Sequence, residues 1–197
     1  MCIRDRYISS YFEKINATKY NGKTYTQDFV LKRDSLSEKK RAKVAGDLST
    51  SNVIAVIEGD KFKDECIVIS AHYDHLGKTS AVDWKQTALS GDPEKTIAIQ
   101  VEKDSVFNGA DDDGSGTVSL LEIAEAFVLA KKEGHGPQRT IVVVAFTGEE
   151  LGLWGSKYYV EHPVFPLEQT VANLNIDMVG RIDAVSYTHL RAHETKA

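Results

Sequence analysis

The spacing of apolar residues predicts a short helix followed by two exposed strands in the first third of the chain. Near the N-terminus, apolar side chains recur at the spacing of one helix face, at Tyr7, Ile8, Tyr11, Phe12 and Ile15. Apolar and polar residues then alternate through 24–31 and 42–57, with the polar run 32–41 between them. This alternation predicts strands at an antiparallel edge of a sheet, joined by an exposed connection.

From Cys66 onward, continuous apolar runs replace the alternation. Residues 66–71 and 139–147 are typical of strands buried on both faces, and 171–178 predicts a third strand. Helical spacing covers 115–132, and a second helix over 152–161 ends before a proline. The order strand, helix, strand, helix, strand predicts an α/β fold. Its central sheet is mixed but mostly parallel, with helices on both faces in an α/β/α sandwich. We interpret the insertion 78–107 as a surface loop with a hairpin at 97–101.

Composition narrows the class of protein. A chain of 197 residues with 42% hydrophobic content can bury a core as one domain. A net charge of −5 without a basic stripe argues against a nucleic-acid partner. The apolar runs are far shorter than the ~20 residues of a membrane helix, so no membrane span is predicted. The two cysteines, Cys2 and Cys66, do not form a disulfide framework.

Both ends resemble translated library-adapter sequence rather than protein. Residues 1–6 carry charges without the apolar stretch of a secretory signal, and 185–197 are polar and unpatterned. We therefore interpret 1–6 and 185–197 as artefact tails, and 7–184 as a single domain that is truncated at its C-terminus.

Polar side chains follow each predicted buried strand. His72 and Asp74 follow the first, Glu149 and Glu150 the second, and Asp177 the third. Ligands bind outside the carboxyl ends of strands in open parallel sheets, so we expect these side chains to converge. Three consecutive aspartates, 111–113, precede the first buried helix and reach the same rim.

This concentration of carboxylates predicts bound cations. Like charges a few ångströms apart in a cleft repel strongly, and a cation removes that cost. Carboxylate and imidazole ligands without thiolate suit zinc, with manganese or cobalt as substitutes. Two metals about 3.5–4 Å apart, bridged by one carboxylate, fit the supply of ligands better than one.

Each piece also has a purely structural interpretation. His72 could be a hydrogen-bonded histidine of the core, Glu149 and Glu150 a solvated pair, and Asp113 or Ser115 a helix N-cap. Asp74 is placed to orient the His72 ring. The convergence of all these residues at one edge of the sheet favours a metal site over separate structural roles. A calcium loop is disfavoured because the spacing of an EF-hand is absent after Asp111.

Four ordered motifs resemble the dizinc M28 family of metallopeptidases, mostly aminopeptidases. They are AHYDHLG at 71–77, NGADDDGSG at 108–116, TGEELGLWGS at 147–156 and NIDM at 175–178. The resemblance implies that His72 and Asp177 bind one zinc, Glu150 the other, and that Asp111 bridges them. It further implies that Glu149 is the general base, that Asp74 is the partner of His72, and that the Asp111–Asp112 peptide bond is cis.

The chain departs from the family in one ligand. The family takes a final histidine, on the second zinc, from a segment well downstream of the aspartate corresponding to Asp177. His189 and His193 stand four residues apart but lie in the adapter-like tail, so we do not assign them. We expect two zinc positions in the native site and, in this chain, one well-formed and one deficient position.

The implied function is a zinc-dependent exopeptidase, most simply an aminopeptidase. A metal-activated water would attack the peptide bond, with a glutamate as general base. Two alternatives stay open: an inactive fragment or non-catalytic metal-binding module of the same fold, and a carboxypeptidase-type relative. By family analogy we expect an exported protein with peptide substrates. The sequence leaves the oligomeric state open.

Overall fold

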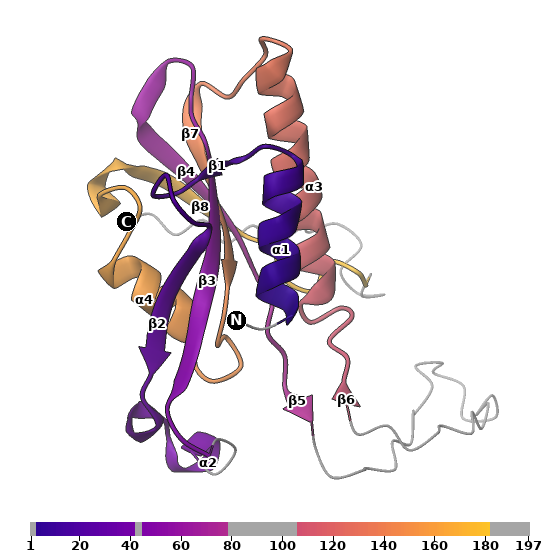
Figure 1. Ribbon diagram of the computed structural model, residues 1–197, viewed down its shortest axis with the longest axis vertical. Coiled ribbons are helices and arrows are strands. Elements are labelled where there is room, and N and C mark those ends of the chain that lie inside the picture. Colours follow the sequence, from indigo (N-terminus) through magenta and orange to yellow (C-terminus); the bar gives the residue numbers. More distant parts are fainter. Residues whose placement is uncertain (1–2, 42–44, 79–105, 182–197) are drawn as a thin grey trace, which may run out of the picture.

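The fold consists of one six-stranded sheet, a two-stranded ribbon and helices on both faces of the sheet (Figure 1). The structure is a computed structural model of the chain, and it describes residues 3–41, 45–78 and 106–181. The elements are α1 (Ile3–Lys14), β1 (Thr18–Lys19), β2 (Thr26–Leu31), η1 (Arg33–Ser35), α2 (Glu38–Arg41), β3 (Leu48–Ile57), β4 (Phe62–His72), β5 (Gly77–Lys78), β6 (Val106–Phe107), α3 (Gly114–Lys132), β7 (Arg139–Phe146), α4 (Trp154–Glu161), η2 (Leu167–Gln169) and β8 (Thr170–Asn175).

The sheet is antiparallel on one side and parallel on the other. Its order is β1-β3-β7-β4-β8, and β2 also pairs with β3. β3 runs antiparallel to β1, β2 and β7, whereas β4 runs parallel to both β7 and β8. The carboxyl ends of β7, β4 and β8 therefore meet at one edge of the sheet, as the sequence predicts.

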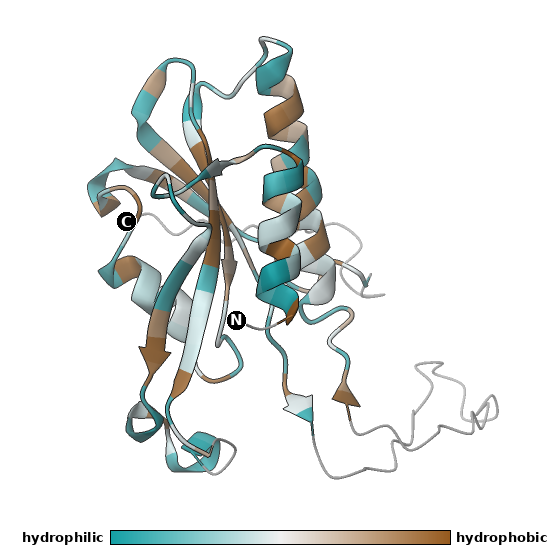
Figure 2. Ribbon diagram, in the orientation of Figure 1, coloured by the Kyte–Doolittle hydropathy of each residue, from teal (hydrophilic) through white to brown (hydrophobic). Residues whose placement is uncertain are grey.

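Alternate residues of the central strands supply the two halves of the core. On β7, Ile141, Val143 and Ala145 belong to the cluster under α1 and α3, and Val142, Val144 and Phe146 to the cluster on the α4 side. This division follows from the period-2 geometry of a strand. Apolar colouring runs along these strands in Figure 2, whereas the region of η1 and α2 is hydrophilic. A run of apolar residues is needed wherever both faces are covered.

The structure confirms the predicted fold class and shifts several boundaries. The strand predicted at 42–57 begins at Leu48, and the one predicted at 171–178 ends at Asn175. Among the strands of the described residues, β8 lies at an edge of the sheet, and its Val171 is 52% exposed. β5 and β6 pair at the two ends of the insertion, but the hairpin predicted at 97–101 lies outside the described residues.

The N-terminal helix begins earlier than predicted. α1 starts at Ile3, within the stretch interpreted as an artefact tail, and Arg4 donates to the backbone oxygen of Tyr73 at 2.9 Å. The division into tails and one catalytic domain stays a prediction. Among the helices of the described residues, none has the length and apolar character needed to cross a membrane.

Candidate metal centre

The strand ends bring the predicted site residues to one rim. His72 is the last residue of β4 and pairs in register with Phe146, the last residue of β7, so the segment carrying Glu149 and Glu150 leaves the sheet beside it. On the other side of β4, Ser70 pairs with Asn175 at the end of β8, two residues before Asp177. The loop that enters α3 contacts this edge, where the Asp113 carboxylate accepts from the backbone of His72.

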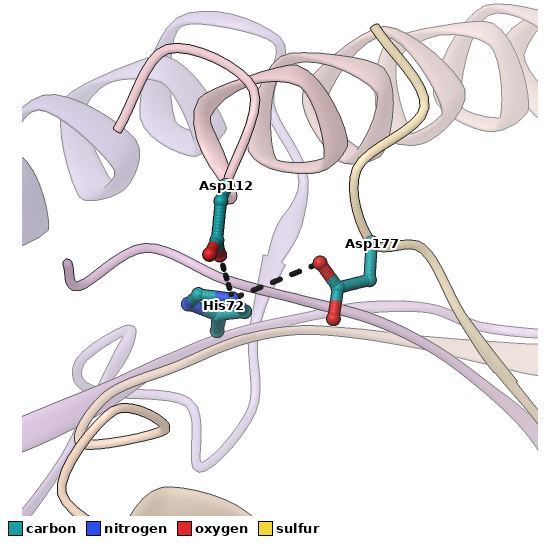
Figure 3. Close-up of side chains that lie close together, drawn as sticks. All are labelled: His72, Asp112 and Asp177. Atoms are coloured by element: carbon teal, nitrogen blue, oxygen red, sulfur yellow. Dashed lines mark ion pairs between the residues drawn. The ribbon is translucent and has the colours of Figure 1, made fainter. Parts of the chain in front are cut away.

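One group of possible metal ligands consists of His72, Asp112 and Asp177 (Figure 3). His72 Nε2 lies 3.0 Å from Asp112 Oδ1 and 3.9 Å from Asp177 Oδ1. Asp112 descends from the loop before α3, and Asp177 approaches from the segment after β8. Three segments far apart in the sequence thus aim one nitrogen and two oxygens at the same place.

The His72 ring is held so that Nε2 faces the carboxylates. Its Nδ1 lies 3.1 Å from the backbone oxygen of Asp74 and 3.7 Å from Asp74 Oδ1. Burial lowers the pKa of His72, but the hydrogen bond and charge of Asp74, with the charges of Asp113 and Glu149, outweigh burial and raise this pKa to about 9. The carboxylates around the His72 ring therefore stabilise a positive charge at this place, and a bound metal ion would supply such a charge.

Asp113 joins the three segments that build the centre. It is the N-cap of α3, where its carboxylate accepts from Gly116 N at 2.9 Å, which confirms the first of the two alternatives, Asp113 or Ser115, predicted for this cap. The same carboxylate accepts from the backbone of His72 at 3.1 Å and of Met178 at 3.2 Å. Burial raises the pKa of Asp113 to about 6 against the opposing effect of these bonds.

A second group of possible ligands consists of His75, Asp112 and Glu150. His75 Nδ1 lies 2.9 Å from Glu150 Oε1 and 4.0 Å from Asp112 Oδ2. The two oxygens of Asp112 are thus divided, with Oδ1 toward His72 and Oδ2 toward His75. This is the arrangement expected of a carboxylate that bridges two cations.

The structure places Asp112, and not Asp111, between the two groups. Asp111 Oδ1 accepts from Ser115 Oγ at 3.0 Å and from Gly180 N at 2.9 Å, and Oδ2 lies 3.1 Å from Arg181 Nε. The contacts of these neighbours therefore favour Asp112, one residue further along, over Asp111 for the bridging position. The cis peptide bond is likewise Asp112–Asp113, not Asp111–Asp112. In an irregular loop, the backbone decides which of three neighbouring aspartates turns inward, and the composition of the loop does not.

Asp74 also holds the segment that carries the two glutamates. Its Oδ1 accepts from Glu149 N at 3.1 Å, and its Oδ2 accepts from Glu150 N at 3.3 Å. Glu149 lines a cavity of about 240 Å³ together with His72 and Asp177. Burial raises the pKa of Glu149, as suits a group that takes up a proton.

The donor atoms of both groups fit zinc. Zinc holds nitrogen and oxygen at about 2.0–2.2 Å in a tetrahedron, which puts neighbouring ligand atoms roughly 3.3 Å apart. The separations between these ligand atoms, 2.9–4.0 Å, lie around that value. Buried His75 Nδ1 makes no hydrogen bond to any residue in the described ranges, as expected of a ligand atom without its ion.

Sequence reasoning missed two members of these groups, Asp112 and His75. Both stand in the motifs that revealed the site, one residue from Asp111 and one from Asp74. The motifs therefore located the right segments, but gave no reason to prefer Asp112 over its neighbours or to add His75. His189 and His193 lie outside the described residues.

Comparisons with known proteins identify the family of this chain. The family model described as "Peptidase family M28" matches residues 52–197. A probable zinc metalloprotease of Pyricularia oryzae is 31% identical over 71% of this chain and 21% of its own length. An aminopeptidase of Mus musculus is 37% identical over 53% of this chain and 14% of its own length. This chain spans between 9% and 21% of the first curated relatives it matches.

A solved structure has the same fold. A Zn-dependent exopeptidase from Parabacteroides distasonis superposes with a TM-score of 0.58 at 21% identity, covering 91% of this chain and 53% of that one. At this identity the likeness supports the architecture only.

Proposed function

Because this chain belongs to peptidase family M28, we propose that it acts as a zinc-dependent exopeptidase, with release of N-terminal residues as its favoured reaction. The observation that carries the proposal is the Asp112 carboxylate, shared between two groups of ligand atoms at the rim of a largely parallel sheet. Peptides are the substrates of the family.

His72, Asp112 and Asp177 would hold the first zinc, and Asp112 and Glu150 would contribute to the second. Bound zinc would lower the pKa of a water and polarise a substrate carbonyl. The chain's own part is to fix the ligand atoms. Asp74 orients two of these ligands without binding the metal itself, because its carboxylate oxygens contact the His72 ring and the backbone of Glu150.

Glu149 is the group that would move a proton in this reaction. Its side chain lines the cavity beside His72 and Asp177, and burial raises its pKa toward the working range of a general base. A carboxylate oxygen of Glu149 takes the proton from the attacking water and passes it to the nitrogen of the leaving amine. The second transfer completes the cleavage and regenerates the carboxylate.

Hydrolysis of an aminoacyl p-nitroanilide panel tests the reaction, and peptides blocked at the N-terminus test the carboxypeptidase alternative. We expect Glu149→Gln to reduce turnover by at least ~10²-fold while zinc content stays at the level of the parent chain. Loss of zinc in this variant would make Glu149 a ligand. Full activity would refute its role as a base.

Two neighbouring variants test the bridge. Asp112→Ala should deplete both zinc positions, while Asp111→Ala should retain zinc because Asp111 faces Ser115 and Gly180. Zinc per chain, measured by elemental mass spectrometry after dialysis, decides between them. Equal zinc in the two variants would refute the shared carboxylate. Zinc binding without hydrolysis in the parent chain would favour the non-catalytic alternative. Export stays a prediction from the family analogy.

A further inference from the structure

Two lysines line the cavity beside the second group of metal ligands, and the reaction proposed above uses neither of them. The cavity, of about 460 Å³, has Glu150 and His75 in its wall together with Lys39 and Lys40. The lysines belong to α2, in the connection between β2 and β3, and are far from Glu150 in the sequence. Their positive charges affect what this cavity can bind.

The ammonium group of Lys40 lies against the segment that follows Glu150. A Cβ built on Gly152 would lie 3.5 Å from Lys40 Nζ and 3.7 Å from Trp154 Nε1, so two nitrogen donors converge beside this glycine. Gly152 has a φ of +122°, a conformation that glycine adopts at little cost. A side chain at this position would occupy the space next to both nitrogens.

Neither nitrogen meets an acceptor among the residues that the structure describes. Lys40 forms no ion pair within those ranges, whereas the more exposed Lys32 and Lys63 both form one. Trp154 Nε1 makes no hydrogen bond there either. Lys40 is half-buried, and Lys39 adds a second positive charge to the same cavity. A cation that has lost part of its water and has no counterion favours the binding of an anion.

The rest of the wall indicates an organic anion. Apolar side chains make up much of it, namely Leu31, Leu48, Leu76, Leu151 and Trp154. Such a wall lowers the local dielectric constant, which strengthens the attraction between Lys40 and a negative charge. It also fits the hydrocarbon part of an amino-acid residue. An amino-acid carboxylate combines both properties.

The cavity next to the first metal position has the opposite charge. Its wall, around about 240 Å³, includes Glu149 and Asp177 beside His72, and these carboxylates attract a free amine. The lysines of the larger cavity repel an amine and attract a carboxylate. The charges thus orient a peptide with its amino end toward Asp177 and its carboxyl end toward Lys40.

We propose that the cavity lined by Lys39 and Lys40 binds a carboxylate carried by the leaving part of the substrate. Lys40, with Trp154 Nε1, is then a residue that determines specificity. The carboxylate is the terminal one of a short peptide or that of an acidic side chain next to the cleaved bond. This inference rests on the proposed exopeptidase function and names its substrate class.

Binding is tested without turnover, in the whole 197-residue chain as purified. N-acetyl-leucine is titrated into the chain, and N-acetyl-leucinamide, which has no negative charge, is the matched ligand. The NMR signal of the Trp154 indole N–H, identified with Trp154→Phe, reports occupation of the cavity. We expect the acid to bind at least ~10-fold more tightly than the amide, as one hydrogen bond to a charged group supplies. This preference should decrease as NaCl is raised from ~0.05 to ~0.5 M.

Three lysine variants assign the preference to one side chain. Lys40→Met should lower the ratio of the two affinities about 10-fold, and Lys40→Arg, which keeps the charge, should retain most of it. Lys132→Met removes the same charge from the exposed end of α3 and should leave the ratio unchanged. N-acetyl-glutamic acid α-amide, whose only carboxylate is on the side chain, distinguishes the two sources of the ligand. Far-UV circular dichroism checks that each variant is folded.

Hydrolysis applies the same comparison to substrates. The ratio of kcat/KM for Leu-Leu to that for Leu-Leu-amide should fall about 10-fold in Lys40→Met, mainly through KM, because the contact is made in the bound substrate as well as in the transition state.

The possible results separate this inference from the proposed function. If the parent chain binds acid and amide equally, or if Lys40→Met keeps the parent's preference, the carboxylate site is refuted whatever hydrolysis is seen. An equal loss of preference in Lys40→Met and Lys132→Met would also refute it, because net charge alone would then be responsible. If the chain prefers the acid through Lys40 but cleaves neither peptides nor nitroanilides, the carboxylate site is confirmed and the proposed function is refuted.

Discussion

Asn52 connects the candidate site to the sheet, and its replacement by alanine should be strongly destabilising. The side chain is fully buried on β3. Its Nδ2 donates to Gly155 O at 2.8 Å and to Gln27 Oε1 at 3.0 Å, and its Oδ1 accepts from Thr147 N at 3.3 Å. One amide thus ties β2, the start of α4 and the segment leading to Glu149. α4 can approach this closely because residue 155 is a glycine, with no room for a Cβ against Asn52 and Thr147.

The size of the effect follows from the groups left unpaired. Asn52→Ala removes three hydrogen bonds and leaves two buried backbone groups, Gly155 O and Thr147 N, without this partner. Each unsatisfied buried group costs about 1–3 kcal/mol. Because Thr147 N makes the longest of the three bonds, we place the loss in free energy of unfolding at about 3–5 kcal/mol.

Urea denaturation followed by circular dichroism measures this loss. Asn52→Asp keeps the acceptor but loses both donors and buries a charge, so it should destabilise the chain at least as much as Asn52→Ala. Ser49→Ala, on the exposed start of the same strand, is the control and should stay within about 0.5 kcal/mol of the parent. A loss below 1 kcal/mol in Asn52→Ala, with an unchanged denaturant slope, would refute this account of the amide.

Three further predictions concern the site, the thiol and the core. Asp74→Asn should lower the free energy of unfolding by about 1.5–3 kcal/mol, since an amide cannot accept both backbone bonds at the Glu149 segment. Zinc affinity should fall 10–100-fold, measured by titration, and unchanged affinity would contradict the positioning role. Cys66 is buried, and burial raises the pKa of its thiol. In a Cys2→Ser variant, iodoacetamide should therefore alkylate native protein at least ~100-fold more slowly than urea-unfolded protein by mass spectrometry, and equal rates would show that β4 opens readily. Phe12→Ala should cost about 3–5 kcal/mol in urea denaturation, because the ring is fully buried between α1 and the sheet. A loss under 1 kcal/mol would mean that α1 does not pack there.

The sequence by itself determined the architecture and the place of the site. The continuous apolar runs at 66–71 and 139–147 could be satisfied only with both faces covered, which is how β4 and β7 lie. Polar residues directly after such runs must emerge at the carboxyl edge of a parallel sheet. The pattern therefore predicts that His72, Asp177 and the glutamate pair lie at one rim, where the folded chain brings them together.

The tertiary structure decided which atoms face one another. Asp111 and Asp112 are chemically identical neighbours, but the Asp111 carboxylate contacts Ser115, Gly180 and Arg181 and not His72. His75 became a candidate ligand because the folded chain brings its Nδ1 to Glu150 and Asp112, with Gly109 packed against its ring across 33 intervening positions. Side-chain directions in irregular loops depend on backbone angles and on distant partners. Hydrophobic periodicity carries no information on backbone angles or on distant partners. The sequence pattern therefore locates the edge of the sheet where the site lies, and the contacts of the folded chain determine which residues can act as ligands.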